Sequence, residues 1–262
     1  MESSCDTGLE KQSFLGHKFV ESDIAGISYV TNKKKFWNDK ILGWEAGRYE
    51  PGSKSRWSLV ERLANRSSES LRHRQQLAVS VISEYVQGRQ IVEFGCGSGL
   101  LAERYIKAGA KSYLGVDIAD KAIDEANRRK DQTVWGERAK FVANSVVVTT
   151  DIEADAIVVS FGLLDWLTEE ERGSLFSQQG KADFLHSISE QRVSISQLLH
   201  RFYVYIAYGF RTKKYVPKYM FVQDIADELD PHHDRQIYLY RHRQLSFGAF
   251  LSSFPIGTKI GR

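Results

Sequence analysis

Cysteine and proline are scarce in this chain, and it has no long apolar run. The 262 residues include two cysteines and four prolines. Cys5 and Cys96 lie far apart in the sequence, which excludes a disulfide framework, and no zinc-type spacing is present, so we expect no bound metal. The longest apolar run, Phe202 to Phe210, is less than half of the roughly 20 residues that a membrane-spanning helix needs. No membrane span is predicted.

The chain also lacks a large excess of charge of either sign. The net charge is +3, which is too small to imply a nucleic-acid coat, so a nucleic-acid partner is not favoured. The first ten residues, MESSCDTGLE, are polar and acidic, without the apolar segment of a secretory signal. We therefore expect a cytoplasmic protein. The length and the 42% hydrophobic content fit one compact domain with a decorated end.

The chain changes character near residue 70. Residues 1–66 form an irregular segment of aromatic and charged residues, which we interpret as an N-terminal appendage. It can act as a lid over a cofactor and a substrate, or simply pack onto the domain. Its aromatic side chains are Phe36, Trp37, Trp44, Tyr49 and Trp57. Residues 67–262 are predicted to form the main domain, with an insertion at about 191–220.

Strand and helix patterns alternate through the main domain. Strands are predicted over 90–94, 112–116, 140–142, 155–160 and 183–188, and helices over 71–86, 100–108, 120–129, 194–208 and 222–229. Thr168 and Glu171 form a capping box that predicts another helix start. The near-continuous apolar run 155–160 is typical of a parallel strand covered on both faces. Two last strands, 236–240 and 246–252, predict an antiparallel hairpin. The fold class is therefore α/β, with a doubly wound Rossmann-like sheet.

The most informative motif is a glycine-rich loop between the first strand and its helix. Gly95, Gly97 and Gly99 alternate there, and the carboxyl end of the first strand is where open α/β sheets bind nucleotides. Asp117 ends the next strand, where a carboxylate can accept both hydroxyl protons of a ribose. Residues 97–102 also satisfy the dinucleotide pattern GxGxxG/A, so the glycines alone leave two cofactors open. Glu93 suits the ammonium of a methionine tail, whereas it would repel a pyrophosphate.

The motifs Glu93-Phe94-Gly95-Cys96-Gly97-Ser98-Gly99 and Gly115-Val116-Asp117 resemble those of class I S-adenosylmethionine-dependent methyltransferases. The resemblance extends over about residues 71–252. It implies a seven-stranded sheet, mostly parallel with a C-terminal antiparallel hairpin, and S-adenosylmethionine as the cofactor. It also implies that the glycine loop holds the methionine part, that Asp117 binds the ribose and that Glu93 approaches the amino end. Cys96 and Ile118 belong to the same two motifs, and we interpret Cys96 as a small packing residue rather than a nucleophile.

Two later segments complete the expected cofactor site. Many family members carry an acid after the third strand to meet the adenine amino group, whereas this chain has Asn144 and Ser145, and either can make that hydrogen bond. The segment 160–167 resembles the one beside the methyl group in members that act on small molecules. We therefore assign Ser160 and Phe161 to the cofactor and expect Trp166 to face the substrate.

Methyl transfer from a sulfonium is a displacement at carbon, so the protein must mainly align the acceptor and exclude water. A general base helps only when the acceptor is a weakly acidic hydroxyl. Asp165 and His186 are the candidate bases, with a capping acid and a core histidine as the alternative interpretations. Candidate substrate contacts are Tyr49, Trp166, Glu190 and Arg211. Arg211 opens a basic and aromatic stretch that either contacts solvent or binds an anionic group of the acceptor.

Our leading hypothesis is a methyltransferase acting on a small molecule or saccharide, with oxygen as the expected acceptor atom. RNA, DNA or protein methylation is the alternative within the family. A nucleic-acid amino group is disfavoured because no NPPY-like tetrapeptide follows the fourth strand. Outside that class, the alternatives are an NAD(P)-binding oxidoreductase and a catalytically silent binding module. The sequence does not indicate an oligomeric state.

Overall fold

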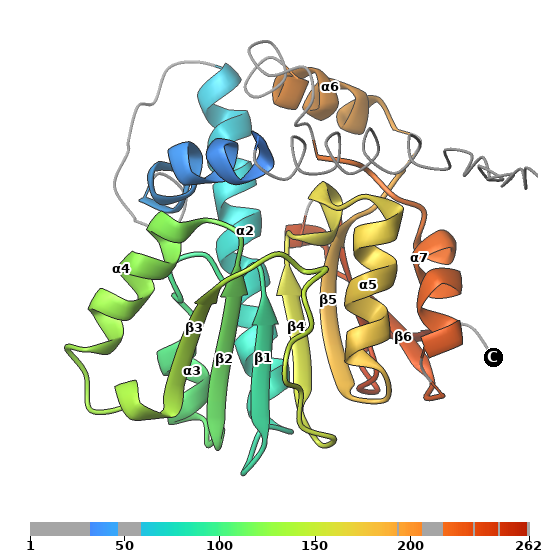
Figure 1. Ribbon diagram of the computed structural model, residues 1–262. Coiled ribbons are helices and arrows are strands. Elements are labelled where there is room, and N and C mark those ends of the chain that lie inside the picture. Colours follow the sequence, from blue (N-terminus) through green and yellow to red (C-terminus); the bar gives the residue numbers. More distant parts are fainter. Residues whose placement is uncertain are drawn as a thin grey trace, which may run out of the picture.

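The computed structural model describes residues 32–46, 59–192, 194–205, 217–232, 234–245 and 247–260 (Figure 1). Its centre is a sheet in which the described residues form eight strands, in the order β3-β2-β1-β4-β5-β7-β6-β8. The strands are β1 (Gln90–Phe94), β2 (Ser112–Asp117), β3 (Ala139–Ala143), β4 (Ile157–Phe161), β5 (Asp183–Ser189), β6 (Ile237–Arg241), β7 (Gly248–Ser252) and β8 (Thr258–Ile260).

The sheet confirms the predicted architecture and adds one strand to it. The first five strands are parallel to one another, through the pairs β2–β3, β1–β2, β1–β4 and β4–β5. Strand β7 pairs antiparallel with both β5 and β6. The predicted hairpin is therefore present, in register from Tyr238 opposite Ser252 to Arg241 opposite Ala249. The prediction of seven strands was one too few, because the short β8 extends the edge by pairing with β6.

Helices cover both faces of the sheet, as a doubly wound fold requires. They are α2 (Leu59–Ser83), α3 (Ala102–Lys107), α4 (Asp120–Lys130), α5 (Glu169–Gln179) and α7 (Val222–Leu229). Helix α6 (Ile195–Val204) instead lies beyond the carboxyl ends of the strands (Figure 1). One core cluster joins α2, α3 and α4 to one face, and a second joins α5 and α7 to the other. β4 is buried on both faces from Ile157 to Ser160, which explains its continuous apolar sequence.

Local signals explain several element boundaries. The Thr168 hydroxyl accepts the Glu171 N–H and the Glu171 carboxylate accepts the Thr168 N–H, so the predicted capping box begins α5. α2 begins earlier than predicted, at Leu59, and passes through residue 66, where the predicted appendage ends. Among the described residues, no helix is both long and apolar enough to cross a membrane.

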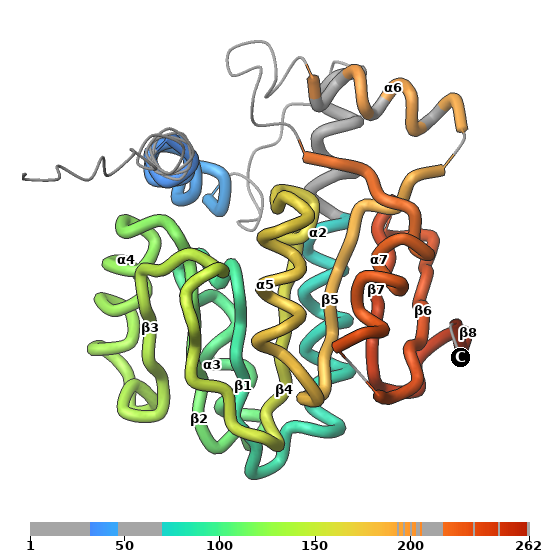
Figure 2. The backbone as a smooth tube through the Cα atoms, turned by 45° about the vertical axis from the view of Figure 1, so that its right-hand side comes forward, coloured from blue at the N-terminus to red at the C-terminus, as the bar shows by residue number. Residues whose placement is uncertain are grey.

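A further helix, residues 32–46, lies beyond the carboxyl ends of the parallel strands (blue in Figures 1 and 2). Its Ile41 packs against Ala119 and Ala122, where the β2 to α4 connection enters α4. Asn38 also accepts the Lys121 N–H through its side-chain oxygen at 3.0 Å. The helix is therefore held directly over the edge of the sheet at which such folds bind ligands.

Asp183, at the start of β5, links several chain segments at the end of the sheet opposite the helix 32–46. Its carboxylate accepts hydrogen bonds from Arg89 at 2.7 Å and from the Ser253 hydroxyl at 2.9 Å, and it also pairs with Arg235. Burial alone would raise the pKa of Asp183, but the hydrogen bonds from these three partners outweigh it, and the pKa is lowered. The carboxylate form is therefore the one that stabilises the fold.

We expect Asp183→Asn to lower the free energy of unfolding at neutral pH by about 1.5–3 kcal/mol, the usual contribution of hydrogen bonds to a charged group. Because the pKa of Asp183 is lower in the folded state than its ordinary value of 3.8, this contribution is fully present above pH 3.8 and is lost as the pH falls through the folded-state pKa. Urea denaturation at neutral and acidic pH measures both effects. Asp155→Asn, at an exposed carboxylate, is the control and should change little; equal stability of the two variants would contradict the assignment.

Candidate functional site

The glycine loop between β1 and α3 is shaped by three residues with left-handed backbone. Gly95, Gly97 and Gly99 have φ angles of 74°, 54° and 70°, which side chains other than glycine rarely tolerate. The N–H groups of Gly95 and Cys96 both donate to the Val116 carbonyl, and that of Gly99 donates to the Cys96 carbonyl. The loop is thus anchored to the end of β2.

Asp117 lies where β2 ends, beside this loop. Its carboxylate accepts the Gly97 N–H and the Ala119 N–H, each at 2.9 Å. Burial raises the pKa of Asp117, and the backbone hydrogen bonds oppose that rise. Each carboxylate oxygen has a second lone pair, so the side chain is oriented by the backbone and can still accept ligand hydroxyls.

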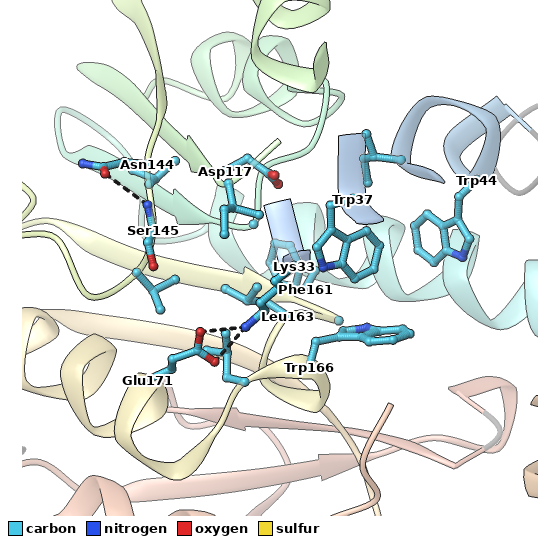
Figure 3. A pocket seen from close by; sticks show the side chains of 17 residues that line it. Lys33, Trp37, Trp44, Asp117, Asn144, Ser145, Phe161, Leu163, Trp166 and Glu171 are labelled. Atoms are coloured by element: carbon cyan, nitrogen blue, oxygen red, sulfur yellow. Dashed lines mark hydrogen bonds and ion pairs between the residues drawn. The ribbon is translucent and has the colours of Figure 1, made fainter. Parts of the chain in front are cut away.

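A pocket opens at the carboxyl ends of β1, β2 and β4 and under the helix 32–46 (Figure 3). One side carries polar groups from the strand ends, including Asp117, Asn144 and Ser145. The other side is aromatic, with Trp37 and Trp166 in edge contact at 4.9 Å between ring centroids. The lining residues are Lys33, Trp37, Ile41, Trp44, Gly95, Val116, Asp117, Ile118, Asn144, Ser145, Val146, Phe161, Gly162, Leu163, Trp166, Leu167 and Glu171.

Side-chain contacts near both ends hold the helix 32–46 over this pocket. At one end, the Lys33 ammonium donates to both carboxylate oxygens of Glu171 at 2.7 Å. Burial lowers the pKa of Lys33, although the hydrogen bond to Glu171 opposes the shift. At the other end, Glu45 accepts the Ser98 N–H at 3.0 Å and the Ser98 hydroxyl at 2.5 Å. Burial raises the pKa of Glu45.

The predicted cofactor residues divide into two groups. Gly95, Asp117, Ile118, Asn144, Ser145 and Phe161 line the pocket. Glu93 is buried beneath the loop and accepts the Tyr113 hydroxyl at 2.6 Å. Cys96 is also buried, and its burial raises the pKa of the thiol. Ser160 is buried and hydrogen bonded to His186 at 2.9 Å. Gly97 and Gly99 shape the loop but are not among the residues that line the pocket. Roles for all of these residues in cofactor binding stay predictions.

The two candidate bases are held by neighbouring elements. Asp165 is in the short 3-10 helix η2 (Leu164–Trp166), and its two oxygens accept the Ser189 N–H at 2.7 Å and the Ser189 hydroxyl at 2.6 Å. His186 is fully buried in β5, between Ser160 and Gln179, whose side-chain oxygen lies 2.6 Å from Nε2. Among the described residues, neither side chain lines the pocket. Their catalytic roles stay predictions.

Of the predicted substrate contacts, Trp166 lines the pocket. Glu190 is bound between Arg192, at 2.6 Å, and Arg241, at 2.5 Å. Burial would raise the pKa of Glu190, but the hydrogen bonds from the two arginines outweigh it and the pKa is lowered. Tyr49 and Arg211 lie outside the described residues. No motif pointed to Lys33, Glu45 or Glu171 as parts of the site, because their partners are distant in sequence.

Comparison with known proteins identifies the central part of the chain. Residues 91–181 match a family model described as "Methyltransferase domain". Residues 91–181 of this chain form a methyltransferase domain. The matched segment includes the glycine loop, Asp117 and η2, so the residues that carry the sequence resemblance also lie within the family match.

Solved structures share the fold of the methyltransferase domain. Magnesium protoporphyrin IX methyltransferase from Synechocystis PCC 6803, solved with bound S-adenosylhomocysteine (SAH), aligns over 85% of this chain and 97% of that chain, with a TM-score of 0.62 and 16% identity. Geranyl diphosphate C-methyltransferase from Streptomyces coelicolor A3(2) aligns over 81% and 80%, with a TM-score of 0.51 and 12% identity. At these identities the likeness shows the fold alone.

Curated relatives are similar over a shorter segment. Ribosomal protein L11 methyltransferase from Histophilus somni (strain 2336) is 37% identical over 73 residues, which is 28% of this chain and 24% of the relative. The chain thus spans about a quarter of the length of the curated relatives that it matches.

The charges around the glycine loop fit S-adenosylmethionine, the cofactor of this family. Burial raises the pKa values of Glu45, Glu93 and Asp117, that of Glu93 to about 8, and nearby acids add to the rise for Glu45 and Glu93. Such a cluster favours a ligand with an ammonium and a sulfonium and disfavours a pyrophosphate. Asp117 and Asn144 line the same pocket as Gly95, and their roles toward ribose and adenine stay predictions.

The raised pKa of Glu93 predicts a pH-dependent cost to stability. Burial raises it to about 8, against 4.5 ordinarily. The folded state keeps a proton that the unfolded state has lost between these values, so stability falls as the pH rises from 4.5 to about 8. We expect Glu93→Gln to reduce this fall by up to about 1.4 kcal/mol per pH unit.

Urea denaturation across this pH range measures the slope. Glu103→Gln, at an exposed position on the same domain, is the matched control and should retain the wild-type slope. An unchanged slope in Glu93→Gln would show that Glu93 is ionised throughout.

Proposed function

We propose that this protein transfers a methyl group from S-adenosylmethionine to a small-molecule or saccharide acceptor. The observation that carries the proposal is one pocket with two kinds of wall. Its polar wall contains Asp117 and Asn144 at the strand ends, and its opposite wall contains Trp37, Trp44 and Trp166. The tryptophan wall favours an acceptor with flat or apolar faces.

The helix 32–46 argues for a small acceptor rather than a macromolecule. It covers the pocket and is held at both ends, by Lys33 on Glu171 and by Glu45 on Ser98. An acceptor under this helix is surrounded by protein, which excludes water from the reacting atoms. The similarity to ribosomal protein L11 methyltransferases does not weigh against this, because it covers only 28% of the chain.

Bound S-adenosylmethionine would supply an electrophilic methyl group on a sulfonium. In the proposed transfer, the acceptor would take the methyl group from the sulfonium sulfur and give up a proton, and SAH would be the product. The residues of this chain would act mainly by positioning: Asp117 would hold the ribose, Phe161 would lie against the cofactor, and Trp166 would fix the acceptor. We propose that the acceptor atom is an oxygen.

Calorimetric titration with SAH, NAD⁺ and NADP⁺ tests the cofactor. We expect binding of SAH alone and a loss of at least roughly tenfold in affinity for Asp117→Ala, because hydrogen bonds to a charged acceptor are lost. Asp124→Ala, at an exposed acid of α4, is the control and should bind as the wild type does. Binding of a nicotinamide cofactor instead would overturn the proposed function.

Transfer of a labelled methyl group to a cell extract tests the acceptor class. We expect the label from S-adenosylmethionine to appear in the low-molecular-weight fraction, since the helix 32–46 covers the pocket. Asp117→Ala, which should bind the donor poorly, is the background control. Label that is found only in protein or only in RNA would contradict a small-molecule acceptor.

A further inference from the structure

Every backbone N–H of the glycine loop from Gly95 to Gly99 already has an acceptor within the chain. Three donate to carbonyl groups of Val116 and Cys96. The Gly97 N–H donates to Asp117, and the Ser98 N–H donates to Glu45. The Ser98 hydroxyl also donates to Glu45. A ligand carboxylate can therefore reach an N–H of this loop only by displacing one of these acceptors.

Glu45 is the acceptor that can leave. Asp117 belongs to the sheet and is also held by the Ala119 N–H. Glu45 instead comes from the helix 32–46, which is held to the domain by side-chain contacts such as Ile41 on Ala119 and Lys33 on Glu171. Helix movement thus removes Glu45 without breaking a strand pairing.

Glu45 also covers the loop at the point where a ligand should approach. A Cβ added at Gly97 would collide with the Glu45 carboxylate, so the space that glycine leaves open is filled by this side chain. Gly95 and Asp117 line the pocket, whereas Ser98 is fully buried beneath Glu45. In the family resemblance, this part of the loop holds the methionine end of the cofactor.

We propose that Glu45 is an internal competitor for the amino-acid end of the cofactor, and that its carboxylate occupies the place of the cofactor carboxylate on Ser98. This inference rests on the proposed function. The adenosine part would lie against Asp117 and Asn144 and would not need the Ser98 donors, so only ligands that carry the amino acid should compete with Glu45. Cofactor binding then requires the C-terminal end of the helix 32–46 to leave the loop.

The test compares SAH with methylthioadenosine, which has the adenine, ribose and thioether but no amino acid. We expect Glu45→Ala to bind SAH at least about tenfold more tightly than the wild type, a gain of about 1.4 kcal/mol. Affinity for methylthioadenosine should not change. Glu45→Gln keeps the size of the side chain but not its charge, and should give a smaller gain. Asp39→Asn, at an exposed carboxylate of the same helix, is the matched control.

The other outcomes are informative. Weaker SAH binding by Glu45→Ala would assign Glu45 to cofactor recognition, and equal gains for both ligands would assign it to general closure of the helix. Either result, or no change, overturns the inference. Failure of the wild type to bind SAH would instead overturn the proposed function. Thermal unfolding of each variant, with Glu45→Gln as the milder change, checks that the fold is intact.

Discussion

The structure around the pocket depends on the way in which the glycine loop satisfies its own backbone. Such loops expose N–H groups at the end of a strand, where each must find an acceptor. Here, carbonyl groups anchor one part of the loop to β2, and two carboxylates complete the remainder. One carboxylate belongs to the sheet and the other to a helix that precedes the domain in sequence. The same set of donors therefore holds both the ribose acid and the covering helix in place.

This arrangement places negative charge on a loop that usually attracts anions. The hydrogen bonds that Glu45, Glu93 and Asp117 accept here come from backbone N–H groups and hydroxyls, and burial raises the pKa of each acid. The cost of burying them falls when a cation arrives. The fold thus favours cationic ligands before any specific contact is made, which separates this site from dinucleotide sites with a similar glycine pattern.

Those parts of the fold that depend on local signals could be predicted from the sequence. The apolar run of β4, the capping box at Thr168 and the glycine loop each occupy a few consecutive residues. β8 could not be predicted, because its three residues are too few to show a period and are mostly exposed. Glu45 is separated from its partner by 53 positions in the sequence, and Lys33 from its partner by 138, so only the folded chain brings them together. Likewise, the partners that hold Asp165 and His186 come from neighbouring elements.

Glu171 both caps α5 and holds the covering helix. One of its carboxylate oxygens accepts the Thr168 N–H and so caps α5, and both oxygens accept hydrogen bonds from the Lys33 ammonium. The cap orients this carboxylate whether or not Lys33 contacts it. The contact therefore has to order only the lysine side chain, at an entropic cost of up to about 2 kcal/mol, and not both partners. A capping residue of the domain thus provides a preorganised receptor for the covering helix.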